Sequence, residues 1–165
     1  MTRPRRGDLA RHWILDPETC FLNHGSFGAT PVSVLEEQAR LRNLIESDPV
    51  RFFERDYIPL MKGAVGKLSE FINANPEGLV FVKNTTEGVN TVLRSLDLKP
   101  GDEIIVTNHS YQACWNAVDF VTERSDAKTV VVDIPFRLKN EEEVVDLIID
   151  KVTDKTVLAM IDTVT

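Results

Sequence analysis

Four short apolar runs recur in the second half of the chain, and helix-compatible segments separate them. The runs are Leu79–Lys83, Glu103–Thr107, Thr129–Ile134 and Thr156–Ile161. Each run lacks the polar positions that alternate along a half-exposed strand, so we expect each strand to be buried on both faces. The helical segments are about Thr86–Leu96, Tyr111–Thr122 and Glu141–Val152, the last with Asn140 as its N-cap and Glu143 three residues in. This alternation predicts an α/β fold with a mostly parallel, helix-covered sheet.

The first half of the chain reads as a tail, a glycine-punctuated loop and helices. Residues 23–31, NHGSFGATP, predict a loop. The sequence from Ser33 to Glu36 matches a capping box that opens a helix to about Glu46. A second helical stretch follows, in which Pro59 should kink or split the helix. Its apolar stripe comprises Phe53, Tyr57, Leu60, Met61, Ala64, Leu68, Phe71 and Ile72. We therefore divide the chain into a tail (1–20), a loop and helices (21–78), and an incomplete α/β unit (79–165).

The turn Asn84-Thr85-Thr86 joins the first apolar run directly to a helix. The first N–H groups of a helix have no partner within the helix, and the positive end of the helix dipole lies there. Thr85 and Thr86 add two hydroxyl donors, so the turn predicts a phosphate site without a glycine-rich loop. The alternative is that a threonine only caps the helix.

Polar or aromatic groups also follow two other predicted strands. The segments are Asn108–Tyr111 and Asp162–Thr165, whereas the remaining strand is followed by the apolar pair Pro135-Phe136. Ligands of open α/β sheets bind beyond the carboxyl ends of the strands. A phosphate site beside an aromatic residue suits a flat, phosphorylated ligand, although loops are commonly polar without any ligand.

Composition and motifs narrow the choice of function. The net charge of −7 argues against a nucleic-acid surface, and no apolar run approaches the roughly 20 residues that cross a bilayer. The sequence contains no GxGxxG, GxxxxGK[ST] or HExxH motif, and its three histidines and two cysteines match no metal spacing. We expect a cytoplasmic protein with no resident metal.

Five blocks of the sequence, in order, resemble the start of class V aminotransferase-like enzymes. The blocks are FLNHGSFGATP, SDPVRFFERDY, FVKNTTEGVNTVLRSL, KPGDEIIVTNHSYQA and AMIDTVT. They cover nearly the whole chain from about Phe21, and the most similar branch is that of the isopenicillin N epimerase-like proteins. The resemblance implies a fold-type I enzyme that uses pyridoxal 5'-phosphate. The chain then corresponds to the N-terminal part of a longer enzyme, with an incomplete large domain.

The resemblance also implies roles for individual residues. Asn84, Thr85 and Thr86 would hold the cofactor phosphate, Tyr111 would stack on the pyridine ring, and Thr165 would lie near the ring. A tyrosine can stack but cannot replace a histidine in proton transfer near neutral pH. The segment containing Asn23, His24, Gly25 and Ser26 would line the substrate side, near a dimer interface. Asp162 is not expected to pair with the pyridine nitrogen.

The resemblance leaves the reaction open. An amino acid substrate would react through an aldimine, by epimerisation, C–S bond cleavage or transamination. No catalytic residue is expected among residues 1–165, because the Schiff-base lysine of these enzymes lies downstream. The whole enzyme is expected to be a homodimer with no nucleic-acid or membrane partner. The alternative is a non-catalytic domain that binds a phosphate ligand or a protein partner.

Overall fold

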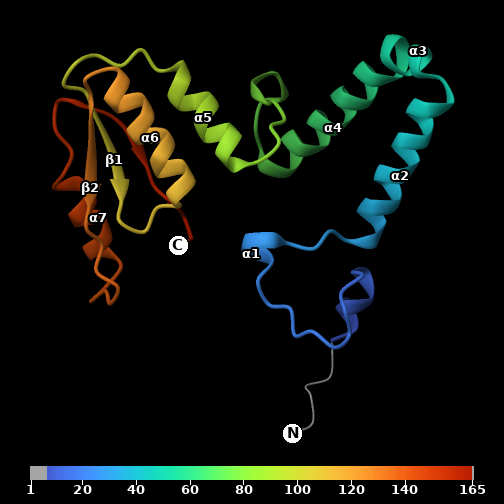
Figure 1. Ribbon diagram of the computed structural model, residues 1–165, viewed down its shortest axis with the longest axis horizontal. Helices are drawn as coiled ribbons and strands as arrows, with labels where there is room; N and C mark the ends of the chain where they lie inside the picture. The colour runs from blue at the N-terminus through green and yellow to red at the C-terminus, as the bar shows by residue number, and fades with distance from the viewer. Residues whose placement is uncertain (1–6, 165) are drawn as a thin grey trace, which may run out of the picture. The chain divides into compact units, whose positions relative to one another are not determined.

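The computed structural model describes residues 7–164, except for the side chain of Ser26. The chain forms two compact units, residues 1–80 and 81–165, and each is described by itself (Figure 1). The finer division at residues 20 and 78 that we expected from the sequence stays a prediction. None of the helices in the described part is both long and apolar enough to cross a membrane.

The second unit contains a sheet of three parallel strands. The strands are β1 (Glu103–Thr107), β2 (Lys128–Val132) and β3 (Thr156–Met160), in the spatial order β2-β1-β3. In register, Ile105 lies opposite Val130 of β2 and Ala159 of β3. The helices of this unit are α5 (Thr85–Ser95), α6 (Gln112–Arg124) and α7 (Glu142–Ile149). Their boundaries lie within a few residues of the predicted ones, and the parallel, helix-covered architecture is confirmed.

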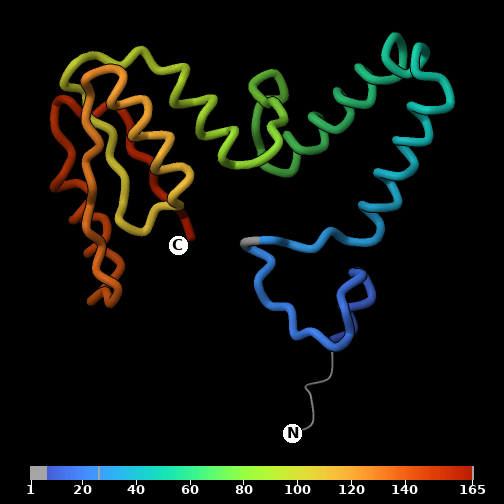
Figure 2. The backbone as a smooth tube through the Cα atoms, in the orientation of Figure 1, coloured from blue at the N-terminus to red at the C-terminus, as the bar shows by residue number. Residues whose placement is uncertain are grey.

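Helices cover both faces of the central strand β1. Ile104 and Val106 pack in one apolar cluster with residues of α5 and α6, including Leu93 and Val118. Ile105 packs on the opposite face, in a cluster that includes residues of α7. Ile104, Ile105 and Val106 are all fully buried. Figure 2 traces this unit from the green-yellow connection to the red C-terminus. Because the three strands are parallel, their carboxyl ends meet at one edge of the sheet.

Burial on both faces does not extend to the two outer strands. Val131 of β2 and Val157 of β3 are 38% and 48% exposed, and β3 alternates between half-buried and exposed positions. The prediction of two buried faces is therefore wrong for β3 and only partly right for β2. Each outer strand pairs with β1 on one side only within the described chain, so it lies at the margin of the helical layers.

The first predicted strand, Leu79–Lys83, is not a strand in this structure. Its residues belong to no sheet, and Val80 and Phe81 are 82% and 51% exposed. A run of this composition requires a neighbouring strand to form a hydrogen-bonded ladder, and the three described strands pair only with one another. The apolar pattern is therefore typical of a strand, but it does not show whether a partner strand is present.

The first unit is built of helices and turns. In chain order these are η1 (Asp8–His12), α1 (His24–Phe27), α2 (Val32–Ser47), α3 (Pro49–Arg51), η2 (Phe52–Asp56), α4 (Tyr57–Ile72) and η3 (Pro76–Gly78). The predicted loop at 23–31 contains the helical turn α1. The predicted capping box is wrong, because α2 begins before Ser33 and Pro31 occupies the N-cap position.

Pro59 lies in the first turn of α4 and follows a change of helix type. The chain is helical from Pro49 to Ile72, but η2 is a π-helical turn. Pro59 has no N–H to donate to the carbonyl of Arg55, and Arg55 lies within η2. The expected split therefore takes the form of a π turn. Much of the predicted apolar stripe is exposed, including Phe53 (59%) and Phe71 (87%).

Because both faces of β1 are packed, truncating a side chain on either face should lower the free energy of unfolding by a similar amount. Ile104→Val and Ile105→Val should each lower the free energy of unfolding by about 0.5–1.5 kcal/mol, because each leaves a small cavity in a different cluster. Val157→Ala, on the exposed side of β3, should cost at most about 0.5 kcal/mol. Urea unfolding followed by circular dichroism measures all three. A negligible cost at either isoleucine would mean that its face of β1 is not packed.

Candidate functional site

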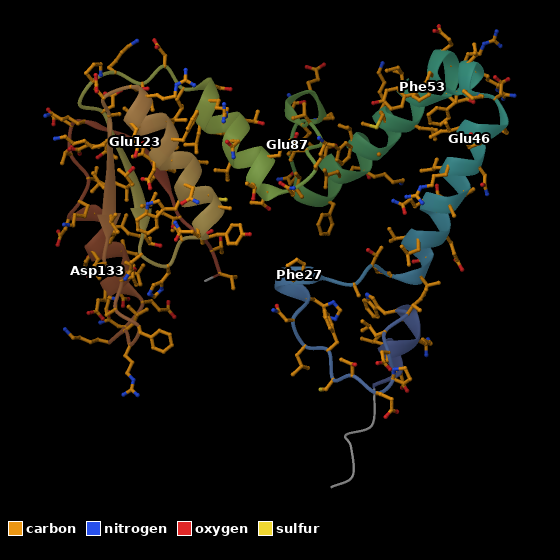
Figure 3. All side chains as sticks on the ribbon, in the orientation of Figure 1. Phe27, Glu46, Phe53, Glu87, Glu123 and Asp133 are labelled. Carbon is orange, nitrogen blue, oxygen red and sulfur yellow. The ribbon has the colours of Figure 1, made fainter. Side chains whose placement is uncertain are left out.

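The N-terminus of α5 is closed by a reciprocal set of hydrogen bonds. The Asn84 Oδ1 atom accepts the N–H of Glu87 at 2.9 Å, and the Glu87 carboxylate accepts the N–H of Lys83 at 2.7 Å. Lys83 Nζ lies 4.0 Å from the same carboxylate. Figure 3 labels Glu87 at this end of the helix. The Asn84 side-chain oxygen is thus engaged in capping the helix, so Asn84 shapes the turn rather than offering that oxygen to a ligand.

Four donors remain at this helix end. Within the described chain, no acceptor lies on the N–H groups of Thr85 and Thr86 or on their hydroxyls, and the first backbone bond of the helix runs from Gly88 N to Asn84 O at 3.1 Å. Thr85 is exposed and Thr86 is half-buried. Free donors at the positive end of an eleven-residue helix favour an anion, so these residues fit a phosphate group.

Helix α7 repeats the same cap with different residues in its first turn. Asn140 lies one residue before the N-cap position, which Glu141 occupies, yet it accepts the N–H of Glu143 at 3.0 Å, and Glu143 accepts the N–H of Lys139 at 2.7 Å. The two residues after Asn140 are Glu141 and Glu142, where α5 has two threonines. Carboxylates in the first turn of α7 already complement the helix dipole and repel an anion. The threonines of α5 leave that end of the helix without negative charge from the first two positions.

Tyr111 lies at the carboxyl edge of the sheet, between β1 and α6. It occupies the N-cap position of α6, and its side chain is 64% exposed. Its N–H donates to Asp162 Oδ2 at 3.3 Å, which links this connection to the segment after β3. The exposed ring is accessible for stacking against a flat group. Asp162 therefore has a positioning contact, a role that its place in the sequence did not reveal.

Asn108 joins the ends of β1 and β2; the sequence placed it in a polar segment after a predicted strand but gave it no individual role. Its Nδ2 donates to Asp133 Oδ1 at 2.7 Å and to the carbonyl of Ile134 at 3.2 Å. Its Oδ1 accepts the N–H of Ile134 at 2.9 Å. The only signal in the sequence was a polar residue directly after a buried strand. These three hydrogen bonds hold the backbone at the carboxyl edge of the sheet, directly before His109 and Tyr111.

Two of the hollows in this unit border candidate site residues. One, of about 550 Å³, is at the carboxyl edge and is lined by residues that include His109, Ile134, Phe136 and Asp162. Phe136, unremarkable in the sequence, thus borders the edge. The other, of about 340 Å³, is apolar and lies between α5 and β3, where Thr85 and Met160 share a wall. The start of α5 and the carboxyl end of β3 therefore line the same hollow.

The remaining predicted site residues belong to the first unit or lie outside the described residues. Asn23, His24 and Gly25 belong to the first unit, where they are exposed around α1, and the backbone of Ser26 lies in that turn. Thr165 lies outside the described residues. The structure therefore brings together Tyr111 and Asp162, and places Thr85 and Thr86 on one helix end. The roles of all these residues as cofactor or substrate contacts stay predictions.

Known proteins that are similar to this chain include a lyase and an epimerase. Hercynylcysteine sulfoxide lyase of Schizosaccharomyces pombe is 28% identical over 128 residues, covering 77% of this chain and 32% of the relative. Isopenicillin N epimerase of Amycolatopsis lactamdurans is 34% identical over 109 residues, covering 63% of this chain and 27% of the relative. The chain thus spans about a third or less of the length of these curated relatives.

Solved structures share the fold. The cystine C–S lyase C-DES, in complex with its product cysteine persulfide, superposes with a TM-score of 0.78 at 22% identity, over 86% of this chain and 37% of that chain. A C-DES mutant with glycine covalently linked to its pyridoxal-phosphate cofactor gives 0.76 at 21% identity, over 88% of this chain and 38% of that chain. The aminotransferase class-V family model matches residues 44–165, which is more than half of the chain. The chain therefore belongs to the aminotransferase class-V family.

Proposed function

We propose that this chain supplies the phosphate-binding part of a pyridoxal-phosphate-dependent enzyme that acts on an amino acid. The observation that carries the proposal is the N-terminus of α5, where two free backbone N–H groups and two threonine hydroxyls lack acceptors in the described chain. The contrast with α7, where the same asparagine–glutamate hydrogen bond encloses two glutamates, supports an anionic ligand at α5.

Each residue has a distinct part in this proposal. Thr85 and Thr86 bind the phosphate, Asn84 and Glu87 hold the turn, and the Tyr111 ring stacks on the pyridine. Asp162 keeps the Tyr111 backbone in place through its 3.3 Å hydrogen bond. When bound, the cofactor supplies an electron sink for bond breaking at the substrate Cα.

We further propose that the substrate is a cysteine derivative and that the reaction is C–S bond cleavage. Several similar proteins support this choice by their names, among them hercynylcysteine sulfoxide lyase and the probable L-cysteine desulfhydrase of Arabidopsis thaliana. With L-cysteine, such cleavage consumes water and yields hydrogen sulfide, ammonia and pyruvate. Epimerisation and transamination begin from the same cofactor and are the competing reactions, and isopenicillin N epimerase is among the relatives.

The first prediction from this proposal concerns Thr86. Thr86→Ala should weaken pyridoxal-phosphate binding by about 1.5–3 kcal/mol, roughly 10- to 100-fold in Kd, because a hydrogen bond to a charged group is lost. The matched control is Thr91→Ala, since Thr91 lies on the same helix and its hydroxyl donates to the Glu87 carbonyl at 2.8 Å. Equilibrium titration followed by cofactor absorbance measures both. Equal affinities for the two variants would contradict a phosphate at this helix end.

The second prediction concerns Tyr111. Tyr111→Ala should loosen the cofactor and shift its absorption band, because the stacked ring is removed, whereas Tyr111→Phe should preserve both properties. The backbone N–H that bonds to Asp162 is present in all three proteins, so the comparison isolates the ring. If Tyr111→Ala leaves the band and the Kd unchanged, the ring does not stack on the cofactor.

A third prediction separates the reactions. The protein expressed from its full reading frame and loaded with pyridoxal phosphate should release sulfide and pyruvate from L-cysteine or L-cystine. Racemised cysteine would indicate epimerisation, and a keto acid that retains sulfur would indicate transamination. Cofactor binding without turnover of any amino acid in a broad panel would instead favour the non-catalytic alternative.

A further inference from the structure

Helices α5 and α6 end beside each other, at the opposite edge of the sheet from the candidate site. Both helices start toward the carboxyl ends of the strands, and Figure 1 shows both ending where β1 and β2 begin. A hydrogen bond from Gly101 N to Asp126 O, at 2.8 Å, joins the turn before β1 to the segment that follows α6. The two helix ends therefore lie at the amino edge of the sheet, and all of their residues belong to the second unit.

Two arginines at these helix ends share one aromatic ring. The guanidinium of Arg94, on α5, lies over the Phe120 ring with its Cζ 4.8 Å from the ring centroid, and the guanidinium of Arg124, on α6, lies 5.3 Å from the same centroid. Both distances fall within the roughly 6 Å at which a cation is attracted to an aromatic face. Two like charges are thus held within about 10 Å of each other, which is about one Debye length at 0.1 M salt.

Neither arginine has a negatively charged partner in the part of the chain that the structure describes. Arg94 Nε donates to the side-chain oxygen of Asn90 at 3.3 Å, and no other hydrogen bond or ion pair within the described residues involves either guanidinium. Asp97, which follows α5 closely, is paired with Lys99 instead. Because neither guanidinium donates to a carbonyl at a helix end, capping of the helices leaves most of their N–H donors unused.

The two arginines also line a hollow of about 340 Å³, which we call the arginine hollow. Its aliphatic lining consists of Leu93, Leu96, Leu98 and Val121. Leu93 and Val121 belong to the apolar core between α5, α6 and the sheet, whereas both arginines are exposed. The arginine hollow therefore combines buried apolar side chains with two accessible positive charges whose spacing is set by one ring.

This combination fits an acidic segment of a protein better than a nucleic acid or a free small anion. The chain has a net charge of −7, and two arginines are too few to bind a phosphate backbone. A site for a small molecule encloses most of its ligand, whereas the charged groups here are exposed. Arginine and aromatic side chains are enriched in protein–protein contacts, and a guanidinium binds a carboxylate through paired N–H groups.

We propose that the arginine hollow docks an acidic segment of a partner protein. Carboxylates of that segment bind Arg94 and Arg124, and an adjacent apolar side chain packs on the aliphatic lining. Phe120 is a positioning residue, because its ring holds both guanidiniums. The contact goes beyond the proposed function, since it involves neither the start of α5 nor Tyr111.

The test uses the protein expressed from its full reading frame and two labelled peptides that differ only in charge. One peptide alternates glutamate with leucine, and the other has glutamine in place of each glutamate. Fluorescence anisotropy at low salt measures the Kd of each. The glutamate peptide should bind at least about tenfold more tightly, and its Kd should rise with salt, because the carboxylates pair with exposed charges.

Variants assign the binding to the arginine hollow. Arg94→Gln and Arg124→Gln should each raise the Kd of the glutamate peptide about three- to fivefold, as expected for exposed ion pairs, and the double variant about tenfold. The matched control is Arg137→Gln, which removes the same charge from an exposed arginine after β2 and should change the Kd less than about twofold. Phe120→Leu keeps both charges but removes the ring, so it should also raise the Kd of the glutamate peptide.

The alternative is that the two arginines only complement the dipoles of the helix ends. In that case Arg94→Gln and Arg124→Gln would lower the urea midpoint of unfolding, and their peptide affinities would equal that of Arg137→Gln. This result overturns the proposal, as does equal or absent binding of the two peptides. Tighter binding of single-stranded DNA, lost in the same two variants, would identify a nucleic acid as the ligand and also overturns it. Failure to bind pyridoxal phosphate counts against the proposed function alone.

Discussion

The covering of β1 on both faces is the constraint on which the second unit depends. Ile104 and Val106 are buried on one side and Ile105 on the other, so helices must lie above and below the strand. A parallel sheet of this kind requires long crossover connections, and each helix runs back against the strands. The starts of α5 and α6 consequently lie toward the edge where the strands end. The position of the candidate site follows from the packing of isoleucine and valine.

The sequence pattern Lys-Asn-x-x-Glu forms the same hydrogen bonds at the starts of two helices, α5 and α7. In both, asparagine and glutamate satisfy donors at the helix start, and lysine pairs with the glutamate. The difference lies in the two residues between them, which are threonines in α5 and glutamates in α7. Since the caps are equivalent, capping alone does not explain the threonines of α5. The comparison within one chain thus shows that the same hydrogen bonds form with either pair of residues between asparagine and glutamate.

The sequence predicted well what depends on local chemistry. Buried runs identified β1 to its exact ends, and the hydrogen bond between Asn140 and Glu143 followed from residue spacing alone. The sequence prediction was wrong where neighbouring segments determine the structure. Leu79–Lys83 has the composition of a strand but pairs with no other strand, and β3 is half-exposed. At the site, Thr85 and Thr86 could be found because helix starts have a sequence signature. Asn108 could not, because its partners lie 25 and 26 residues away.

The hydrogen bonds of Asn108 between β1 and β2 also determine what deamidation of this residue would do to the protein. One amide group donates to Asp133 and accepts from the Ile134 backbone, so both ends of the side chain are used. Hydrolysis of that amide to a carboxylate would leave the acceptor in place and remove the donor. Two carboxylates would then face each other across a distance of about 2.7 Å, where like charges repel. Deamidation of Asn108 alone would therefore weaken the connection between the ends of β1 and β2.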